Sequence, residues 1–129
     1  MRKPLLILAF LTVVVLLSAC TEQKSPAVQA VEAYQTAFAS KDADALAQLS
    51  CADWEAQALL EMDSFQAVGT VLDSVACTEA GAEGDAVLVT CEGSISLTYG
   101  EEKRSFDLSG RTFTVIQEGA DWLVCGAQP

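Results

Sequence analysis

The apolar residues of the first half of the chain recur at the spacing of an amphipathic helix. Ser25 and Pro26 suit the N-cap and first turn of that helix. Its inward stripe is predicted to be Ala27, Ala30, Val31, Tyr34, Ala37 and Phe38. Two more helices are expected, a short one capped by Asp42 and a longer one over residues 53–62. The first half of the domain is therefore predicted to be helical.

Beyond residue 70 the apolar pattern changes to alternation, which is typical of strands. Four strands are expected, over residues 71–77, 87–99, 106–115 and 122–125. Within the third, the apolar parity shifts after Ser109 and Gly110, which indicates a β-bulge that bends the strand. Helices followed by an antiparallel four-stranded meander predict an α+β fold.

An apolar run from Leu5 to Leu17 precedes the helices and follows Arg2 and Lys3. A basic start followed by a short apolar stretch is typical of a secretory signal peptide, and the run is shorter than the roughly 20 residues that span a bilayer. The run ends in Leu-Ser-Ala-Cys, which resembles the lipobox of bacterial lipoproteins. That resemblance implies cleavage before Cys20 and attachment of a diacylglyceryl group to its thiol. An ordinary signal peptide with a chance cysteine and an uncleaved anchor are the alternatives.

The predicted organisation is a lipoprotein signal peptide over 1–19, a lipidated Cys20 with a short tether over 20–26, and one domain over 27–126. It places the domain in a bacterial cell envelope, lipid-anchored on the extracytoplasmic side of a membrane. The chain has 7 basic and 18 acidic residues. Loss of Arg2 and Lys3 with the leader leaves five basic residues, so the mature charge is −13. Such an excess of acid argues against nucleic acid as a partner.

Besides Cys20 the chain has four cysteines, Cys51, Cys77, Cys91 and Cys125. An even number in an exported chain predicts two disulfides. Zinc is disfavoured because no two of these cysteines have a C-x₂₋₄-C spacing and the chain lacks histidine, so we expect no metal or cofactor. Of three connectivities we favour Cys77–Cys91, which a hairpin about Glu83 and Gly84 places opposite one another. Cys51–Cys125 then follows by elimination.

The order of these elements resembles the NTF2-like superfamily, also called cystatin-like, and in particular small bacterial lipoproteins with such a domain. The residues that carry the resemblance are Val31-x-x-Tyr34-x-x-x-Phe38, Lys41-Asp42, Leu46-x-x-Leu49, Trp54, Phe113-Thr114-Val115-Ile116 and Trp122-Leu123-Val124. The resemblance implies a curved sheet whose concave face holds the helices and encloses a pocket. It implies no particular reaction, because this fold carries isomerases, dehydratases, hydrolases and pure binding modules.

Six residues are candidates for lining such a pocket: Tyr34, Trp54, Asp73, Tyr99, Arg111 and Trp122. The four aromatic side chains could instead belong to the core. Asp73 alternates into an apolar strand face, where a raised pKa would suit a general base. Its alternatives are exposure at a strand edge or an ion pair with Arg111. Arg111 could hold an anion or form a salt bridge, and Asp107 is expected on the outer face.

No recognisable catalytic set is present, and without histidine the chain cannot use histidine-based acid–base or triad chemistry. We therefore expect a membrane-anchored accessory module that binds a small ligand or an envelope protein. One alternative is a small isomerase or dehydratase with Asp73 as base. Another is a structural envelope protein that dimerises. The sequence leaves the ligand, the oligomeric state and any catalytic residue open.

Overall fold

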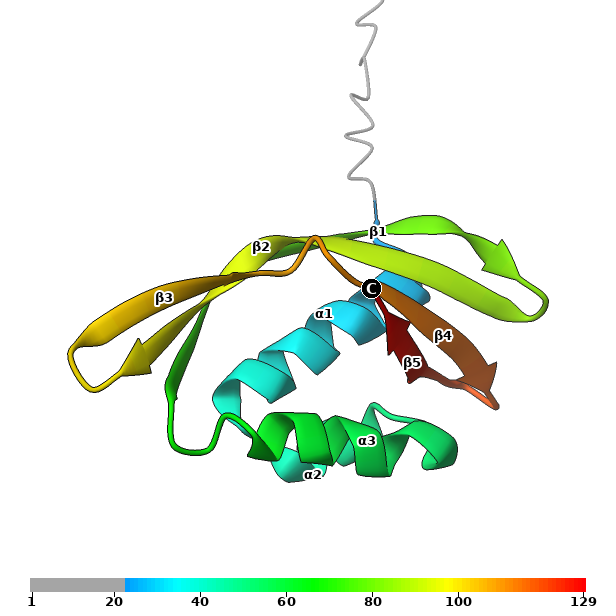
Figure 1. The fold of residues 1–129 in the computed structure, drawn as a ribbon. Helices are drawn as coiled ribbons and strands as arrows, with labels where there is room; N and C mark the ends of the chain where they lie inside the picture. The colour runs from blue at the N-terminus through cyan, green and yellow to red at the C-terminus, as the bar shows by residue number, and fades with distance from the viewer. Residues whose placement is uncertain (1–22) are drawn as a thin grey trace, which may run out of the picture.

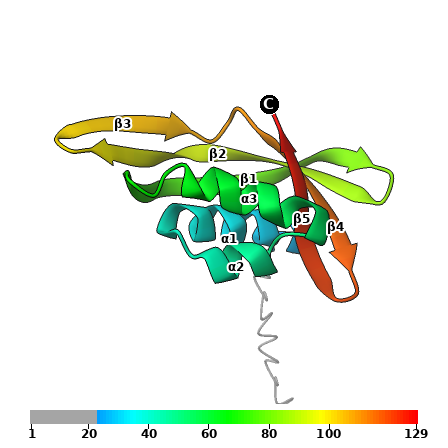
Figure 2. The ribbon, with the colours of Figure 1, turned by 60° about the horizontal axis from the view of Figure 1, so that its bottom comes forward.

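A computed structural model describes residues 23–129 of the chain. The predicted leader and Cys20 lie outside the described residues. Within them, three helices lie on one face of a curved antiparallel sheet, which bends around them (Figures 1 and 2). The predicted α+β class and its curved sheet are confirmed. No helix between residues 23 and 129 is long and apolar enough to cross a membrane.

The first two of the three helices begin at the residues that their capping signals indicate. The helices are α1 (Pro26–Ser40), α2 (Ala43–Gln48) and α3 (Ala52–Asp63). The Ser25 hydroxyl accepts a hydrogen bond from the Val28 N–H at 3.3 Å, and the Asp42 carboxylate accepts one from the Ala45 N–H at 3.0 Å. Both contacts satisfy N–H groups that a helix start leaves without partners.

The sheet has five strands rather than the four expected, in the order β1-β2-β4-β5 with β3 also paired to β2. The strands are β1 (Gly69–Glu83), β2 (Ala86–Tyr99), β3 (Glu102–Asp107), β4 (Thr112–Glu118) and β5 (Asp121–Gln128). All pairs are antiparallel, and β3 and β4 share β2 as their partner. The antiparallel meander is confirmed, and the extra strand comes from one interruption.

That interruption lies where a bulge was predicted. β3 pairs with residues 94–99 of β2 and β4 with residues 87–90, so the predicted third strand is broken in two. Between them the chain turns, and the Leu108 N–H donates to the Gly93 carbonyl at 3.0 Å. Gly93 itself has a φ of 128°, a conformation that residues with a Cβ rarely adopt. A bulge and a break shift the alternation of apolar residues in the same way, so the sequence pattern could not distinguish them.

Both predicted disulfides are present. The hairpin of β1 and β2 pairs Cys77 directly with Cys91, and Cys51 joins Cys125. The second bridge links the start of α3 to β5, where Cys51 N–H also donates to the Val124 carbonyl at 2.9 Å. The hydrophobic core lies between the α1 stripe and the concave face of the sheet; its largest fully buried side chains include Phe113, Leu46, Val31, Val89, Val115 and Val124.

Candidate functional site

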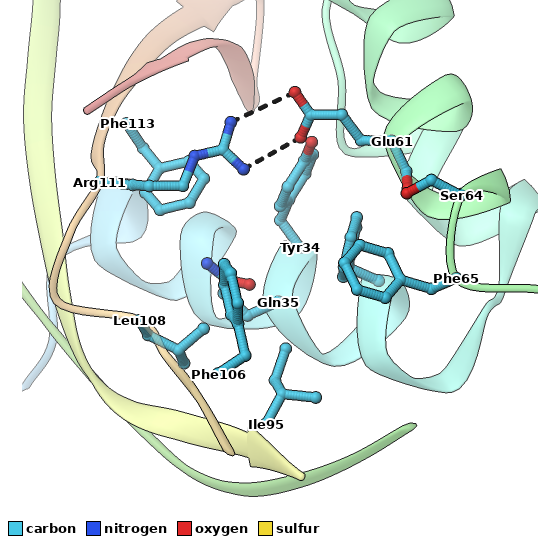
Figure 3. Close-up of a pocket in the computed structure, with 11 residues that line it drawn as sticks. Tyr34, Gln35, Glu61, Ser64, Phe65, Ile95, Phe106, Leu108, Arg111 and Phe113 are labelled. Atoms are coloured by element: carbon cyan, nitrogen blue, oxygen red, sulfur yellow. Dashed lines mark hydrogen bonds and ion pairs between the residues drawn. The ribbon is translucent and has the colours of Figure 1, made fainter. Parts of the chain in front are cut away.

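The concave side of the sheet is not completely filled by the core. A cavity of about 330 Å³ lies between the second half of α1, the end of α3 and the broken part of the sheet. Its lining residues are Tyr34, Gln35, Phe38, Glu61, Ser64, Phe65, Ile95, Phe106, Leu108, Arg111 and Phe113 (Figure 3). The volume is near the lower end of the range for pockets that hold small molecules.

The break between β3 and β4 helps to build this cavity. Leu108 and Arg111 belong to the turn that joins the two strands, and both line the cavity. Phe106, the one aromatic residue of β3, is 40% exposed at the rim. The Phe65 ring meets the Phe106 ring at 6.5 Å and the Phe38 ring at 5.6 Å, both edge to face. Three aromatic rings thus connect α1 to β3 along one side of the cavity.

The charged groups of the lining form a closed pair. The Arg111 guanidinium donates to both Glu61 carboxylate oxygens, at 3.0 and 3.3 Å (Figure 3). Both side chains are partly buried, and the guanidinium also lies 5.8 Å from the centre of the Phe113 ring. Each terminal nitrogen of the guanidinium thus contacts one carboxylate oxygen, and the two charges neutralise each other at the cavity wall.

Tyr34 connects the cavity with the core. Its ring is buried and meets the Phe113 ring edge to face at 5.9 Å, and its hydroxyl accepts a hydrogen bond from the Trp54 indole N–H at 3.1 Å. Burial raises the pKa of Tyr34, and the nearby Glu61 carboxylate acts in the same direction, whereas the Trp54 hydrogen bond and Arg111 oppose the rise. The phenol is therefore held in its protonated form.

The predicted pocket residues divide into two groups. Tyr34 and Arg111 line the cavity, and Trp54 reaches it only through its hydrogen bond to Tyr34. Tyr99 is 46% exposed at the end of β2, and Trp122 packs against the core from β5. Neither Tyr99 nor Trp122 is part of the lining.

Asp73 is not in the cavity, and its predicted inward orientation is wrong. The pairing of β1 with β2 shifts between Leu72 and Ser74, so Asp73 is the extra residue of a bulge. Its carboxylate instead accepts hydrogen bonds from the hydroxyls of Ser94 and Ser96, at 3.4 and 2.6 Å. These serines alternate with buried residues of β2, so Asp73 lies on the outer face of the sheet. Of the two alternatives, Asp73 is exposed, and Arg111 pairs with Glu61 rather than with Asp73.

Asp107 has the exposed position that the sequence predicted. Its carboxylate accepts a hydrogen bond from the Ser109 N–H at 2.8 Å. This contact lowers the pKa of Asp107, because it favours the ionised form. The residue stabilises the turn between β3 and β4 and takes no part in the lining.

Several lining residues were not identified as site residues from the sequence. Gln35 carried a usable signal, since it lies four residues after Val31 and three before Phe38, within the apolar stripe of α1. Glu61, Ser64 and Phe65 gave no comparable signal, because only tertiary packing brings them to β3 and β4. Among residues 23–129 no group of three or more histidine, cysteine or acidic side chains is arranged to hold a metal.

The ionisation of Tyr34 gives a testable prediction. An unfolded tyrosine loses its proton near pH 10. With a raised pKa in the folded state, Tyr34 contributes stability that is complete below about pH 10 and is lost as the pH rises through its folded pKa. Tyr34→Phe is expected to show a smaller loss of unfolding free energy between neutral and strongly alkaline pH. Denaturant unfolding at a series of pH values measures this.

The chain has only two tyrosines, so a matched variant isolates the group. Tyr99→Phe leaves Tyr34 as the single source of phenolate absorbance. We expect Tyr34 to lose its proton at a higher pH than free tyrosine does. A Tyr34 titration at or below the free value would contradict the buried, protonated state of this phenol.

No protein-family model matches the sequence, and no curated protein matches it. Solved structures do match its fold. An NTF2-like protein with a cystatin-like fold from Novosphingobium aromaticivorans is 16% identical, with a TM-score of 0.54 over 79% of this chain and 77% of that one. A putative calcium/calmodulin dependent protein kinase II association domain from Xanthomonas campestris is 14% identical, with a TM-score of 0.55 over 76% and 79%.

An LEH-like epoxide hydrolase from M. tuberculosis is 20% identical, with a TM-score of 0.50 over 79% of this chain and 83% of that one. At such low identities the likeness concerns the fold and no activity. The chain therefore has an NTF2-like, cystatin-like fold, as the sequence predicted. That it is a lipoprotein remains a prediction.

Proposed function

We propose that this domain binds a small, largely apolar molecule in the cavity on the concave side of its sheet. The observation that carries the proposal is the cavity itself. Six of its eleven lining residues are phenylalanine, isoleucine or leucine, and its floor is formed by buried side chains such as Ile95, Leu108 and Phe113. Apolar side chains that line an open hollow lack packing partners on that side and contact water, so covering them with an apolar ligand is favourable.

An accessory, non-catalytic role is favoured over an isomerase or dehydratase. The proposed base Asp73 lies on the outer face, hydrogen-bonded to Ser96. The carboxylate that does line the cavity, Glu61, is engaged through both oxygens by Arg111. A general base must lie within hydrogen-bonding reach of the proton that it removes. Asp73 lies outside the cavity, and Glu61 lines it only as the partner of Arg111.

The binding proposal is tested with naphthalene as probe. The full chain in phospholipid nanodiscs is dialysed to equilibrium against naphthalene, with empty nanodiscs as the blank. Ile95→Phe adds a ring to the cavity lining and is expected to weaken binding at least about tenfold, the cost of losing one to two buried methylene equivalents of contact. Leu60→Phe is the matched control, because Leu60 is 65% exposed on α3 and does not line the cavity.

Binding of naphthalene that is lost in Ile95→Phe and kept in Leu60→Phe supports the proposal. Absence of binding to the unmodified chain refutes it. Equal binding by all three chains refutes it as well, since the probe would then occupy another surface.

We further propose that the domain is anchored to a bacterial membrane by a lipid on Cys20. The support is the sequence alone: the lipobox-like Leu-Ser-Ala-Cys and the apolar run before it. An acyl chain contributes about 0.8 kcal/mol per buried CH₂, so a diacylglyceryl group provides the two chains that stable attachment requires. The folded domain, rich in acid, would contribute no attraction to an anionic surface.

Cys20→Ser is expected to abolish incorporation of a labelled fatty acid and to release the protein from the membrane fraction of an expressing bacterium. Thr21→Ser, one residue further on, is the control and should remain lipidated. If Cys20→Ser stays in the membrane fraction without label, the apolar run acts as an uncleaved anchor and the lipid is not the attachment.

A further inference from the structure

We infer that the ligand is an uncharged molecule with an apolar ring system and one hydrogen-bonding group, which the side-chain amide of Gln35 recognises. The inference deepens the proposed function and depends on it. It rests on three features of the cavity: a buried amide without a protein partner, charges that are already paired, and a lining rich in aromatic rings.

Gln35 is only 5% exposed, and its side-chain amide forms no hydrogen bond with any residue between 23 and 129. Leaving a buried amide without any partner is unfavourable, because the amide has lost its hydrogen bonds to water. Yet no fully enclosed side-chain nitrogen or oxygen in this part of the chain lacks a partner. The Gln35 amide is therefore not fully enclosed, and Gln35 is one of the residues that line the cavity (Figure 3).

At the position of Gln35 on α1 an apolar residue would be expected, so the amide needs an explanation. It occupies the inward stripe between Val31 and Phe38, where an apolar side chain would pack without any unsatisfied group. An amide offers one acceptor and two donors in a plane, so it pairs with a carbonyl, a hydroxyl or another amide. A polar side chain at this point is best explained by a polar group on the molecule that it faces.

The charge state of the ligand follows from the Arg111–Glu61 pair. The pair already balances its own charges, so a carboxylate or a cation in the cavity would meet no unpaired opposite charge. Drawing Arg111 or Glu61 away from its partner would leave a partly buried charge alone. Breaking a partly buried pair from one side is unfavourable, because the remaining charge keeps its desolvation cost. A neutral ligand leaves the pair intact.

The shape of the ligand follows from the rings. Phe38, Phe65 and Phe106 present faces and edges along one side, and Phe113 lies on another. Aromatic rings pack against planar ring systems in offset or edge-to-face arrangements. A bicyclic body with one polar substituent suits a cavity of about 330 Å³ at the lower end of the small-molecule range.

The test compares four probes of nearly equal shape: naphthalene, 2-naphthamide, 2-naphthoate and 2-naphthamidine, the last two charged at neutral pH. Each is measured by equilibrium dialysis with the full chain in phospholipid nanodiscs and with Gln35→Leu, against empty nanodiscs. We expect 2-naphthamide to bind at least about tenfold tighter than either ion, because it gains a hydrogen bond from Gln35 and leaves the ion pair undisturbed. In Gln35→Leu the preference for 2-naphthamide over naphthalene should disappear, with naphthalene binding unchanged or tighter.

The outcomes separate the two proposals. If naphthalene binds but 2-naphthamide gains nothing from Gln35, or if 2-naphthoate binds best, the inference about the ligand is overturned while the binding function stands. If none of the four probes binds, both are overturned. The thermal midpoint of Gln35→Leu should not fall, since the replaced amide has no protein partner; a clear fall would assign Gln35 a structural role and also overturn the inference.

Discussion

Replacing Gly93 with alanine is expected to lower the unfolding free energy by more than about 3 kcal/mol, among the largest effects of any single substitution. A Cβ at this position would overlap the Ser74 carbonyl group and approach the Val75 Cα to 3.1 Å. The φ of 128° adds backbone strain for any residue with a side chain. Since the obstacle is the main chain of β1, no side-chain rotation can relieve it.

Gly81→Ala is the matched control for this substitution. Gly81 has a similar φ of 144°, but a Cβ added there would meet nothing within 4 Å, so it reports the strain without the overlap. Denaturant unfolding of both variants separates the two contributions. Because Gly93 also accepts the hydrogen bond from Leu108, Gly93→Ala should loosen the turn that lines the cavity and weaken naphthalene binding. Equal stability of the two variants would show that β1 and β2 are not this close.

Removal of the Cys51–Cys125 disulfide as a double serine variant is expected to lower the unfolding free energy by about 4 kcal/mol, for a closed loop with a sequence separation of 74. The Cys77–Cys91 double variant is the comparison and should lose about 3 kcal/mol, because its separation is 14. The physical reason is that each bridge restricts the unfolded chain, and the longer loop is restricted more.

Denaturant unfolding at constant pH measures both losses. The expected order, with the longer loop more costly, holds if the folded structure survives in each variant, which circular dichroism checks. A loss below about 1 kcal/mol for Cys51→Ser with Cys125→Ser would mean that the backbone pairing of Leu49 and Cys51 with Val124 holds α3 to β5 without the bridge.

Local patterns in the sequence were sufficient for most of the fold. The caps at Ser25 and Asp42 depend on neighbouring residues only, and they set the starts of α1 and α2. The pairing of Cys77 with Cys91 needs the turn at Gly84, which pairs Glu83 with Ala86, and also the one-residue shift of register between Glu79 and Gly81. In each case the interaction spans few residues, so the pattern of the sequence contains it.

Two strand predictions were wrong because the sequence shows where the alternation of apolar and polar residues shifts, but not which irregularity of the strand shifts it. The shift between Leu108 and Phe113 reflects a broken strand, although a bulge would have produced the same pattern. Around Asp73 the opposite happened: a bulge inverted the faces of β1 where continuous alternation was assumed. The orientation of a strand residue depends on every irregularity before it, so a single extra residue reverses it.

The sequence predicted fewer of the cavity residues than of the helices and strands. Tyr34 and Arg111 were identified, yet the Arg111–Glu61 contact that sets the charge of the lining joins residues 50 positions apart. Such a pair depends on how α3 lies relative to the turn between β3 and β4, which periodicity does not describe. Gln35 is the exception, because a polar residue at an apolar helical position is visible in the sequence.

The direction of α1 has a consequence for the route by which a ligand arrives. The helix begins at Pro26, close to the first described residue, while its cavity-lining residues lie about 12–18 Å further along the axis, from Tyr34 to Phe38. If the chain is held at Cys20, as proposed above, the cavity-lining part of α1 is the part further from the point of attachment. A ligand that enters from the aqueous side would then need no contact with the bilayer.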